Sequence, residues 1–486
     1  MSWRSLATLL VALSAAALAA CHRSDGASTG TVTDASVVMV TPVAAPPDGA
    51  ASDATHPALR AERFSEAGML AEAALYLDDA DFRRRTLVES LVNPKNTYSK
   101  QRLDAYGLKT AGWDLLPVWN PQSVPATSAT AADLRAHRSL AIDPAAPRLW
   151  DGKRPTTMAG WVALGRQVFF GYPLRVEIFV SWALEHPDVG ERVGVRAATD
   201  GTYPGVRIFT DIQGRTALGI TCAICHASID EHGQTTVGEA RRVFDYGALR
   251  NAYHAQTGVR VDADLARRMK SWGPGRADVT EDDDEDPVAI PDLWGLRDQT
   301  ALTQAGTINH VGPTALAIRQ ETQLLTSNHQ RVRPPRELAY ALALYVYSLA
   351  PKPHAPSAAT SSAATAQSAR GRALFASEGC TTCHSNAAFG GPPVPAERIG
   401  TDRALAFGGA RGTGTYRPPA LLRVADAAPY FHQGAVPTLE DVLSPARLEP
   451  TYAGSPVGKG AVAGHVFGTD LPAADRAALA SYMRTL

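Results

Sequence analysis

The sequence predicts a mostly α-helical protein with two compact domains, a flexible linker between them and a helical extension at the N-terminus. Apolar residues recur at helical spacing through most of the chain, whereas strand patterns are sparse. Residues 351–368 are mainly Pro, Ala, Ser and Thr without an apolar pattern, which predicts the linker. A CxxCH motif lies on each side of that linker.

Composition fits a globular protein and excludes several classes. The chain of 486 residues is long enough for two to four domains at about 100–200 residues each. Hydrophobic residues make up 45% and charged residues 20%, which excludes wholesale disorder. The 47 basic and 48 acidic residues give a net charge of −1, so no strong basic field is present to bind nucleic acid.

Residues 1–21 predict an export signal. Arg4 precedes an apolar run at 6–20 that is too short for a stable membrane span. Small residues lead directly to Cys21, an order that resembles a bacterial lipoprotein signal, in which this cysteine becomes the lipidated N-terminus. Ordinary signal cleavage leaving a free Cys21 is the alternative. We expect an exported protein of the periplasm or cell envelope, bound to a membrane through the lipid anchor only; His22 in place of Asp favours the outer membrane.

The N-terminal third is predicted to contain a tether and then helices. Residues 22–58 are rich in small and polar residues and predict a flexible tether. Residues 59–150 form the predicted helical extension, with one apolar helical pattern at its start and a second at 81–91, before Pro94.

Residues 151–350 form the first predicted domain, with helices expected at 158–170, 176–184 and 335–349. An acidic run at 281–287 reads as a solvated loop, with a calcium site as the alternative, because carboxylate oxygens are the ligands that calcium prefers.

Residues 369–486 form the second predicted domain. Its helices are expected at 370–377, 438–443 and 472–486.

The two CxxCH motifs contain every cysteine except Cys21. In c-type haem attachment the two thiols form thioethers with the porphyrin, and the adjacent histidine ligates the iron. A thioredoxin-like pair would need a βαβ pattern, and a four-cysteine zinc site would leave both histidines unexplained. We therefore predict two cytochrome c-type domains with two covalently bound haems, attached through Cys222, Cys225, His226, Cys380, Cys383 and His384.

The second iron ligand in the C-terminal domain is predicted to be His465, with His432 as the alternative. Both stand among aromatic residues and glycines, which permit close approach of the backbone to a flat cofactor. Met483 lies in the last helix and is interpreted as a core residue. Two histidine ligands would give a six-coordinate electron-transfer haem of lower potential than a His/Met pair.

The N-terminal haem has no clear second ligand. We expect its iron to keep an open or weakly held position where a small oxidant binds. The candidates weighed are His232, His254, His310, His329, Met158 and Met269.

Taken with these motifs, the chain resembles the bacterial dihaem cytochrome c peroxidase superfamily, which includes the enzyme that matures the tryptophylquinone of methylamine dehydrogenase and a dihaem rubber oxygenase. The resemblance covers roughly 160–350 and 369–486 and is closest to the rubber-oxygenase branch. In that branch a histidine is the second ligand of the C-terminal haem. The similar segments are 164–170, 211–215, 219–222, 272–276, 370–375, 429–434, 438–442 and 464–471.

This resemblance implies distal acid/base residues in the segment 291–321. Gln320 or Glu321 would position a proton for O–O cleavage, and His310 would line the pocket. Trp272 or Trp294 would bridge the two haems. The structural alternatives are a solvated charge for Glu321, a hydrogen-bonded loop residue for His310, and packing for both tryptophans.

The chain also departs from the peroxidases. No methionine follows the segment 430–432, where they carry a haem ligand, and position 242, where a switchable histidine would stand, is Arg. The long insertions of the rubber oxygenase are missing, and 59–150 has no recognised counterpart.

We therefore expect an oxidoreductase whose C-terminal haem transfers electrons and whose N-terminal haem reacts with hydrogen peroxide or dioxygen. Its partner would be a redox protein that donates or accepts electrons. The alternatives are an electron carrier with two six-coordinate haems and a haem-based binding or sensing module.

Overall fold

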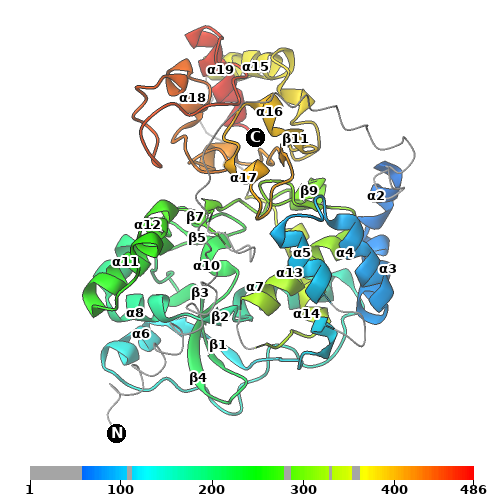
Figure 1. Cartoon of the computed structure of the whole chain (residues 1–486), viewed down its shortest axis with the longest axis vertical. Coiled ribbons are helices and arrows are strands. Elements are labelled where there is room, and N and C mark those ends of the chain that lie inside the picture. Colours follow the sequence, from blue (N-terminus) through cyan, green and yellow to red (C-terminus); the bar gives the residue numbers. More distant parts are fainter. Residues whose placement is uncertain (1–56, 107–111, 279–285, 328–330, 353–361) are drawn as a thin grey trace, which may run out of the picture. The chain divides into compact units, whose positions relative to one another are not determined.

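The computed structural model describes residues 57–106, 112–278, 286–327, 331–352 and 362–486 (Figure 1). This part of the chain is rich in helices and carries small antiparallel sheets, which confirms the predicted helix-rich fold class. Cys21, residues 22–56 of the predicted tether at 22–58, and most of the acidic run at 281–287 lie outside the described residues. No helix within the described ranges is long and apolar enough to cross a membrane.

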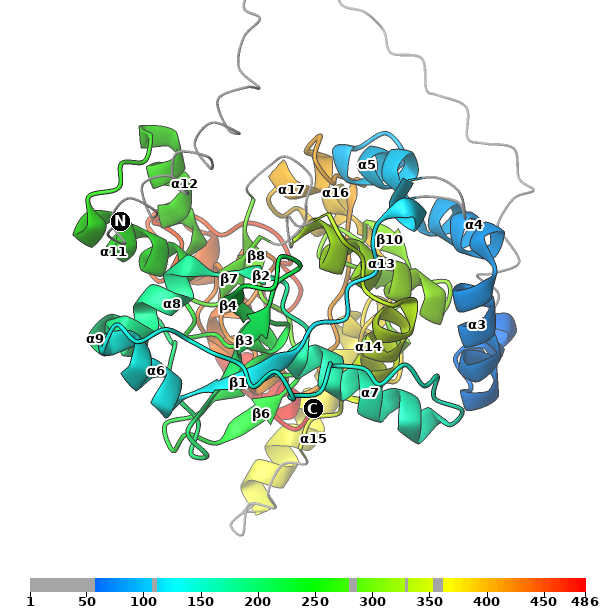
Figure 2. The ribbon, with the colours of Figure 1, turned by 90° about the horizontal axis from the view of Figure 1, so that it is seen from below.

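The largest core lies between helices that the sequence separates widely. Helix α7 (Met158–Gly171) packs against α14 (Arg336–Ser348), which also packs against α13 (Pro313–Thr326). Helices α3 (Glu66–Asp78) and α4 (Ala80–Ser90) lie beside α13 and close the same core (Figure 2). The predicted extension at 59–150 and the predicted domain at 151–350 thus bury their apolar residues together.

A four-stranded antiparallel sheet stands next to this core and was not expected from the sequence. Its strand order is β1-β3-β4-β2, and β1 (Ser123–Thr127) brings part of the segment 59–150 into it. The central pair aligns Val206 with Ile220. The other strands are β2 (Arg175–Val176), β3 (Thr202–Thr210) and β4 (Thr216–Ile220).

The C-terminal part contains α15 (Ser362–Ser377), which packs against α19 (Ala473–Met483) over a separate core. Helix α15 begins inside the predicted linker at 351–368, which corrects the end of that linker. Its first turns are Ser362-Ala-Ala-Thr-Ala, and alanine is the strongest helix former, so the composition that suggested a linker also suits a helix.

The two main helix pairs make the same contact. At Gly165 in α7, a Cβ atom would lie 2.0 Å from the carbonyl oxygen of Ala341 and 2.5 Å from the Cβ of Tyr345 in α14. Only glycine permits this close crossing. Four residues after the glycine, Phe169 meets the Tyr345 ring edge-on, with centroids 5.3 Å apart.

At Gly371 in α15, a Cβ atom would lie 2.0 Å from the carbonyl oxygen of Ala478 and 2.8 Å from the Cβ of Tyr482 in α19. Phe375, four residues after this glycine, meets the Tyr482 ring edge-on at 5.5 Å. The N-terminal and C-terminal parts thus repeat one helix-crossing unit with the spacing Gly-x-x-x-Phe.

Shorter elements complete the described part. The helices are α2 (Pro57–Arg63), α5 (Thr97–Ala105), α6 (Ser128–Arg135), α8 (Ile178–Glu185), α9 (Pro187–Arg192), α10 (Ala223–His226), α11 (Tyr246–Thr257), α12 (Ala263–Trp272), α16 (Ala396–Ile399), α17 (Ala404–Phe407) and α18 (Leu439–Val442). The two-stranded sheets pair β5 (Ala227–Ile229) with β6 (Thr235–Val237), β7 (Arg276–Ala277) with β8 (Val288–Ala289), β9 (Ala301–Leu302) with β10 (Ile308–Asn309), and β11 (Val394–Pro395) with β12 (Thr415–Tyr416).

Candidate functional site

The first CxxCH motif lies at the end of β4, against β3. The amide of Thr221 donates to the carbonyl oxygen of Gly205 at 2.9 Å. Gly205 has φ +87°, and a Cβ atom there would lie 2.1 Å from the amide nitrogen of Ile224. The strand therefore lies closer to the motif helix α10 than any residue with a side chain would allow.

Cys222, Cys225 and His226 line a cavity of about 270 Å³, the first-motif cavity. The Nδ1 of His226 lies 3.1 Å from the carbonyl oxygen of Pro291, an arrangement in which Nδ1–H donates and Nε2 keeps its lone pair. Burial lowers the pKa of His226 to about 4, so the ring stays neutral, the form that binds metals.

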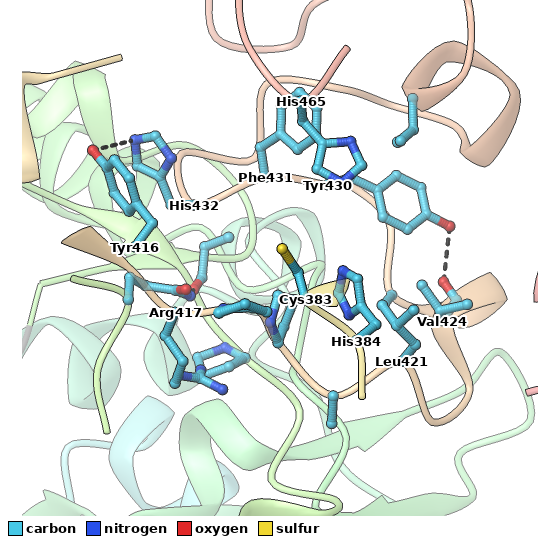
Figure 3. Close-up of a pocket in the computed structure, with 18 of the residues that line it drawn as sticks. Cys383, His384, Tyr416, Arg417, Leu421, Val424, Tyr430, Phe431, His432 and His465 are labelled. Atoms are coloured by element: carbon cyan, nitrogen blue, oxygen red, sulfur yellow. Dashed lines mark hydrogen bonds between the residues drawn. The ribbon is translucent and has the colours of Figure 1, made fainter. Parts of the chain in front are cut away.

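The second motif begins where α15 ends and lines a cavity of about 280 Å³, the second-motif cavity (Figure 3). His384 repeats the arrangement of His226: its Nδ1 lies 2.6 Å from the carbonyl oxygen of Phe389, which leaves Nε2 available. Burial also lowers the pKa of His384. The two cavities thus match in size and in the way each motif histidine is held.

His465 faces His384 across the second-motif cavity (Figure 3). Its backbone has φ +49°, a left-handed conformation that costs free energy in a residue with a side chain. Two hydrogen bonds hold it there: its amide donates to Ile399 O at 2.8 Å, and its carbonyl accepts from Arg447 Nη2 at 2.7 Å. Burial lowers the pKa of His465 to about 4, so this ring is neutral too.

His432 lines the same cavity but is held at its side (Figure 3). Its ring stacks on Tyr416 with centroids 4.4 Å apart, and its Nε2 lies 3.3 Å from the tyrosine hydroxyl and 3.8 Å from an oxygen of Asp402. Met483 also lines the cavity and packs in the core between α15 and α19. Of these side chains, His465 is the one that faces His384.

The first-motif cavity, unlike the second-motif cavity, has no second candidate iron ligand among its described lining residues. Among its described lining residues, His226 is the only histidine, and methionine is absent. His329 lies outside the described residues, and the other candidates line neither cavity: His232, His254, His310, Met158 and Met269.

Helix α13 contributes polar side chains to the first-motif cavity. Arg319, Gln320 and Gln323 line it, and Arg319 Nη1 donates to Gln323 Oε1 at 2.6 Å. Gln320, predicted from the sequence, is therefore placed at the cavity.

Glu321, the neighbour of Gln320, does not line the first-motif cavity, which corrects its predicted place in the site. Its buried Oε2 accepts hydrogen bonds from the hydroxyls of Tyr76 at 2.8 Å and Tyr106 at 2.7 Å, and its Oε1 pairs with Arg336 Nε at 2.9 Å. Burial and the Glu321 charge hold the pKa of both tyrosines well above the usual range, so they remain donors. Neighbouring residues of a helix point in different directions, and here that separates Gln320 from Glu321.

His310 is also displaced from its predicted position. It lines neither cavity and is fully buried, with Nδ1 2.8 Å from the carbonyl oxygen of Gln299 and Nε2 2.5 Å from the hydroxyl of Tyr347. The tryptophans split between the cavities: Trp272 lines the first-motif cavity and Trp294 the second-motif cavity.

The sequence did not predict which residues line both cavities. They form a shared wall that consists of Ala289, Ile290, Pro291, Leu296, Gln304 and Arg417. These residues carry no motif, and they meet only because β12 folds back onto the loop at 303–305, where the Arg417 amide donates to Gln304 O at 3.0 Å.

The described cysteines are free. Burial raises the pKa of Cys222 to about 12 and that of Cys225 and Cys380 to about 11. No group of three or more His, Cys, Asp or Glu suited to a metal ion occurs among the described residues, and most of the acidic run at 281–287 lies outside them. Asp286, the described end of the acidic run, pairs with Arg411.

The residues fit a c-type haem in each cavity. Each cavity offers two thiols beside an imidazole that is held through Nδ1. The buried amide of Gln299, at the edge of the second-motif cavity, has no hydrogen-bond partner among the described residues, as expected where a polar group of a ligand completes the site.

One comparison with known protein families agrees with a cytochrome at coarse level. Residues 415–452 match the family described as RoxA-like, cytochrome c-like. This segment is therefore cytochrome c-like and supports a c-type cytochrome with a redox role; it decides no particular branch. No curated protein matches the chain. A crystal structure of a MauG-like protein associated with microbial copper homeostasis is 19% identical over 45% of this chain and 79% of its own, with a TM-score of 0.31.

Proposed function

We propose that the protein is an exported dihaem c-type cytochrome oxidoreductase whose C-terminal haem transfers electrons and whose N-terminal haem reacts with hydrogen peroxide or dioxygen. The difference between the two cavities carries this proposal. In the second-motif cavity His384 faces His465, whereas His226 in the first-motif cavity faces no described histidine or methionine.

The repeated helix crossing supports two haem domains rather than one. Gly165 with Phe169 and Gly371 with Phe375 make the same contacts in pairs of helices that stand beside the two motifs. Since each unit has its own CxxCH motif and its own cavity, each is proposed to hold one haem.

In the C-terminal domain His384 and His465 would be the two iron ligands. Two imidazoles give a six-coordinate iron that exchanges electrons but leaves no position for a substrate. The His465 amide donates to Ile399 O and its carbonyl accepts from Arg447 Nη2, so the backbone that carries this ring is held in place.

In the N-terminal domain His226 would be the only protein ligand, and the haem supplies the redox chemistry when bound. Helix α13 offers amides rather than a carboxylate for the substrate oxygen. The Arg319 guanidinium fixes Gln323, and Gln320 remains beside it to donate a hydrogen bond through its amide. A neutral donor of this kind orients a peroxide or dioxygen molecule without adding charge to the cavity.

The proposed setting follows from the sequence. An export signal ending at Cys21 suits a lipid-anchored protein of the cell envelope, where c-type haem is attached, and a redox protein would exchange electrons with the C-terminal haem.

The test is an EPR and visible spectrum of the purified ferric and half-reduced protein, followed by cyanide and then peroxide. We expect one low-spin and one high-spin haem, with cyanide and peroxide changing only the high-spin signal. Two low-spin signals that neither reagent alters in either redox state would contradict the proposal and leave an electron-carrier cytochrome. Cyanide binding without any reaction of peroxide or dioxygen would instead indicate a binding or sensing module.

A further inference from the structure

Arg417 lies in the wall shared by the two cavities and is the only charged residue of that wall (Figure 3). It follows β12, and two backbone contacts hold it: its amide donates to Gln304 O and its Nε donates to Thr303 O, each at 3.0 Å. The residue is 8% exposed. The guanidinium therefore has a fixed position at the boundary of both cavities.

No carboxylate among the described residues pairs with Arg417. Its Nε is satisfied by Thr303, but Nη1 and Nη2 make no hydrogen bond to the described part of the chain. Burial lowers the pKa of Arg417 to about 10, so the group still carries its charge near neutral pH. A buried cation without a counter-ion is unfavourable, which indicates that an anion from outside the polypeptide completes this site.

Other buried arginines show that this situation is specific to Arg417. Arg411, six residues earlier, pairs with Asp278 and Asp286. Arg447 donates to three backbone carbonyls, and the Arg241 guanidinium likewise donates to backbone carbonyls. Of these four, only Arg417 has both terminal nitrogens free of protein partners.

We propose that Arg417 binds a carboxylate side chain of the porphyrin in each cavity and thereby raises the reduction potentials of both haems. A haem carries two propionates, and the N–H groups of Arg417 Nη1 and Nη2 can donate hydrogen bonds to carboxylates in the plane of the guanidinium. The inference rests on the proposed function, because it requires a haem in each cavity. It assigns Arg417 as a positioning residue that touches both cofactors without ligating iron.

The expected effect has a definite sign. Reduction lowers the positive charge on iron by one, so a nearby cation favours the reduced form. Removal of the Arg417 charge should therefore lower both midpoint potentials.

The experiment compares Arg417→Gln and Arg417→Lys with wild type by spectroelectrochemical titration of the full-length, haem-loaded protein. In Arg417→Gln we expect both haems to become at least tenfold harder to reduce, a fall of about 59 mV for a one-electron couple. Arg417→Lys keeps the charge but loses the planar fork, so its shifts should be smaller.

Arg207→Gln is the matched control. Arg207 is a half-buried arginine whose pKa burial also lowers to about 10, but it bonds to Ser123 and lines neither cavity. Its loss should leave both potentials unchanged.

A shift of neither potential, or of only one, in Arg417→Gln would overturn the inference. Should that variant fail to retain haem, resonance Raman spectra of Arg417→Lys decide: the propionate bending bands of both haems should move, and unchanged bands would overturn it. Neither the potentials nor the Raman bands depend on a reaction with peroxide. A wild-type protein that does not react with peroxide would therefore refute the proposed function without deciding whether Arg417 binds the propionates.

Discussion

At His465 the backbone adopts a left-handed conformation, and the side chain nevertheless faces the second motif (Figure 3). The Nδ1 of this ring is buried and has no hydrogen-bond partner among the described residues. A strained backbone at a histidine that faces the second motif indicates a functional constraint, and iron ligation by this imidazole would supply one.

His465→Ala should therefore convert the C-terminal haem from low-spin to high-spin, because one of its two strong-field ligands is lost. The EPR spectrum of the ferric variant checks this, and added imidazole should restore the low-spin signal. His432→Ala is the control, since Tyr416 and Asp402 hold that ring at the side of the cavity. A low-spin signal that survives in His465→Ala would contradict the assignment.

Gln320 and Glu321 provide a second test at this scale, since they are adjacent in sequence but differ in their surroundings. Glu321→Gln should lower the free energy of unfolding by about 3 kcal/mol, because Arg336 loses a buried partner. Gln320→Leu should leave stability within about 0.5 kcal/mol and slow the reaction with peroxide. Urea unfolding measures the stability of both variants, and stopped-flow absorbance measures their rate of reaction with peroxide. A Glu321→Gln variant that is as stable as wild type but no longer reacts with peroxide would indicate a catalytic role for Glu321.

The sequence predicted site residues only where the pattern is local. The CxxCH motifs place thiols and imidazole within five consecutive positions, so their convergence follows from the chain itself. Glu321 and His310 were misplaced because their partners, Tyr76, Tyr106 and Tyr347, come from distant segments. Arg417 was not predicted for the same reason, since its neighbours come together only when both cavities are formed.

At the scale of single elements, the two glycine crossings set how closely the helices approach. Gly165→Ala and Gly371→Ala each place a Cβ atom 2.0 Å from a backbone carbonyl oxygen, and that contact is relieved only by moving the helices apart. Each variant should lose about 1–3 kcal/mol of stability, the usual cost of overpacking.

Urea unfolding measures this loss. Gly409→Ala is the control, because a Cβ atom there meets nothing within 4 Å. A Gly165→Ala or Gly371→Ala variant as stable as this control would contradict the close crossing.

Helices were predicted more successfully than strands. The expected helices at 158–170 and 81–91 correspond to α7 (Met158–Gly171) and α4 (Ala80–Ser90), since their apolar spacing and their first-turn and last-turn residues are local signals. Strand β3 was missed because Pro204 and Gly205 interrupt a strand pattern. The glycine is required there by the approach of Ile224, a constraint that only the folded structure reveals.

At the scale of the whole described part, the segment preceding the first motif belongs to the structure that holds the cavities. Arg60 in α2 donates to the backbone carbonyls of Arg297 and Gln299, beside the shared wall. Asn96, which caps α5, also donates to the carbonyl oxygen of Gly412 at 3.2 Å. Composition and periodicity predicted helices in 59–150 but contained no information about these partners, so the sequence suggested a separate extension.

Native-state hydrogen exchange tests this integration. Tyr76 in α3 stacks on Tyr340 in α14 with ring centroids 5.4 Å apart, and the Tyr340 hydroxyl donates to Met69 O at 2.6 Å. Because α3, α4 and α14 share one core, we expect their amides to exchange with the same opening free energy and the same dependence on denaturant. Helix α12 buries only Met269 and Trp272 and should open locally at lower free energy. If α3 and α4 exchanged like α12 and not like α14, residues 59–106 would be an appendage, and their contacts with the cavity wall could not stabilise the haem sites.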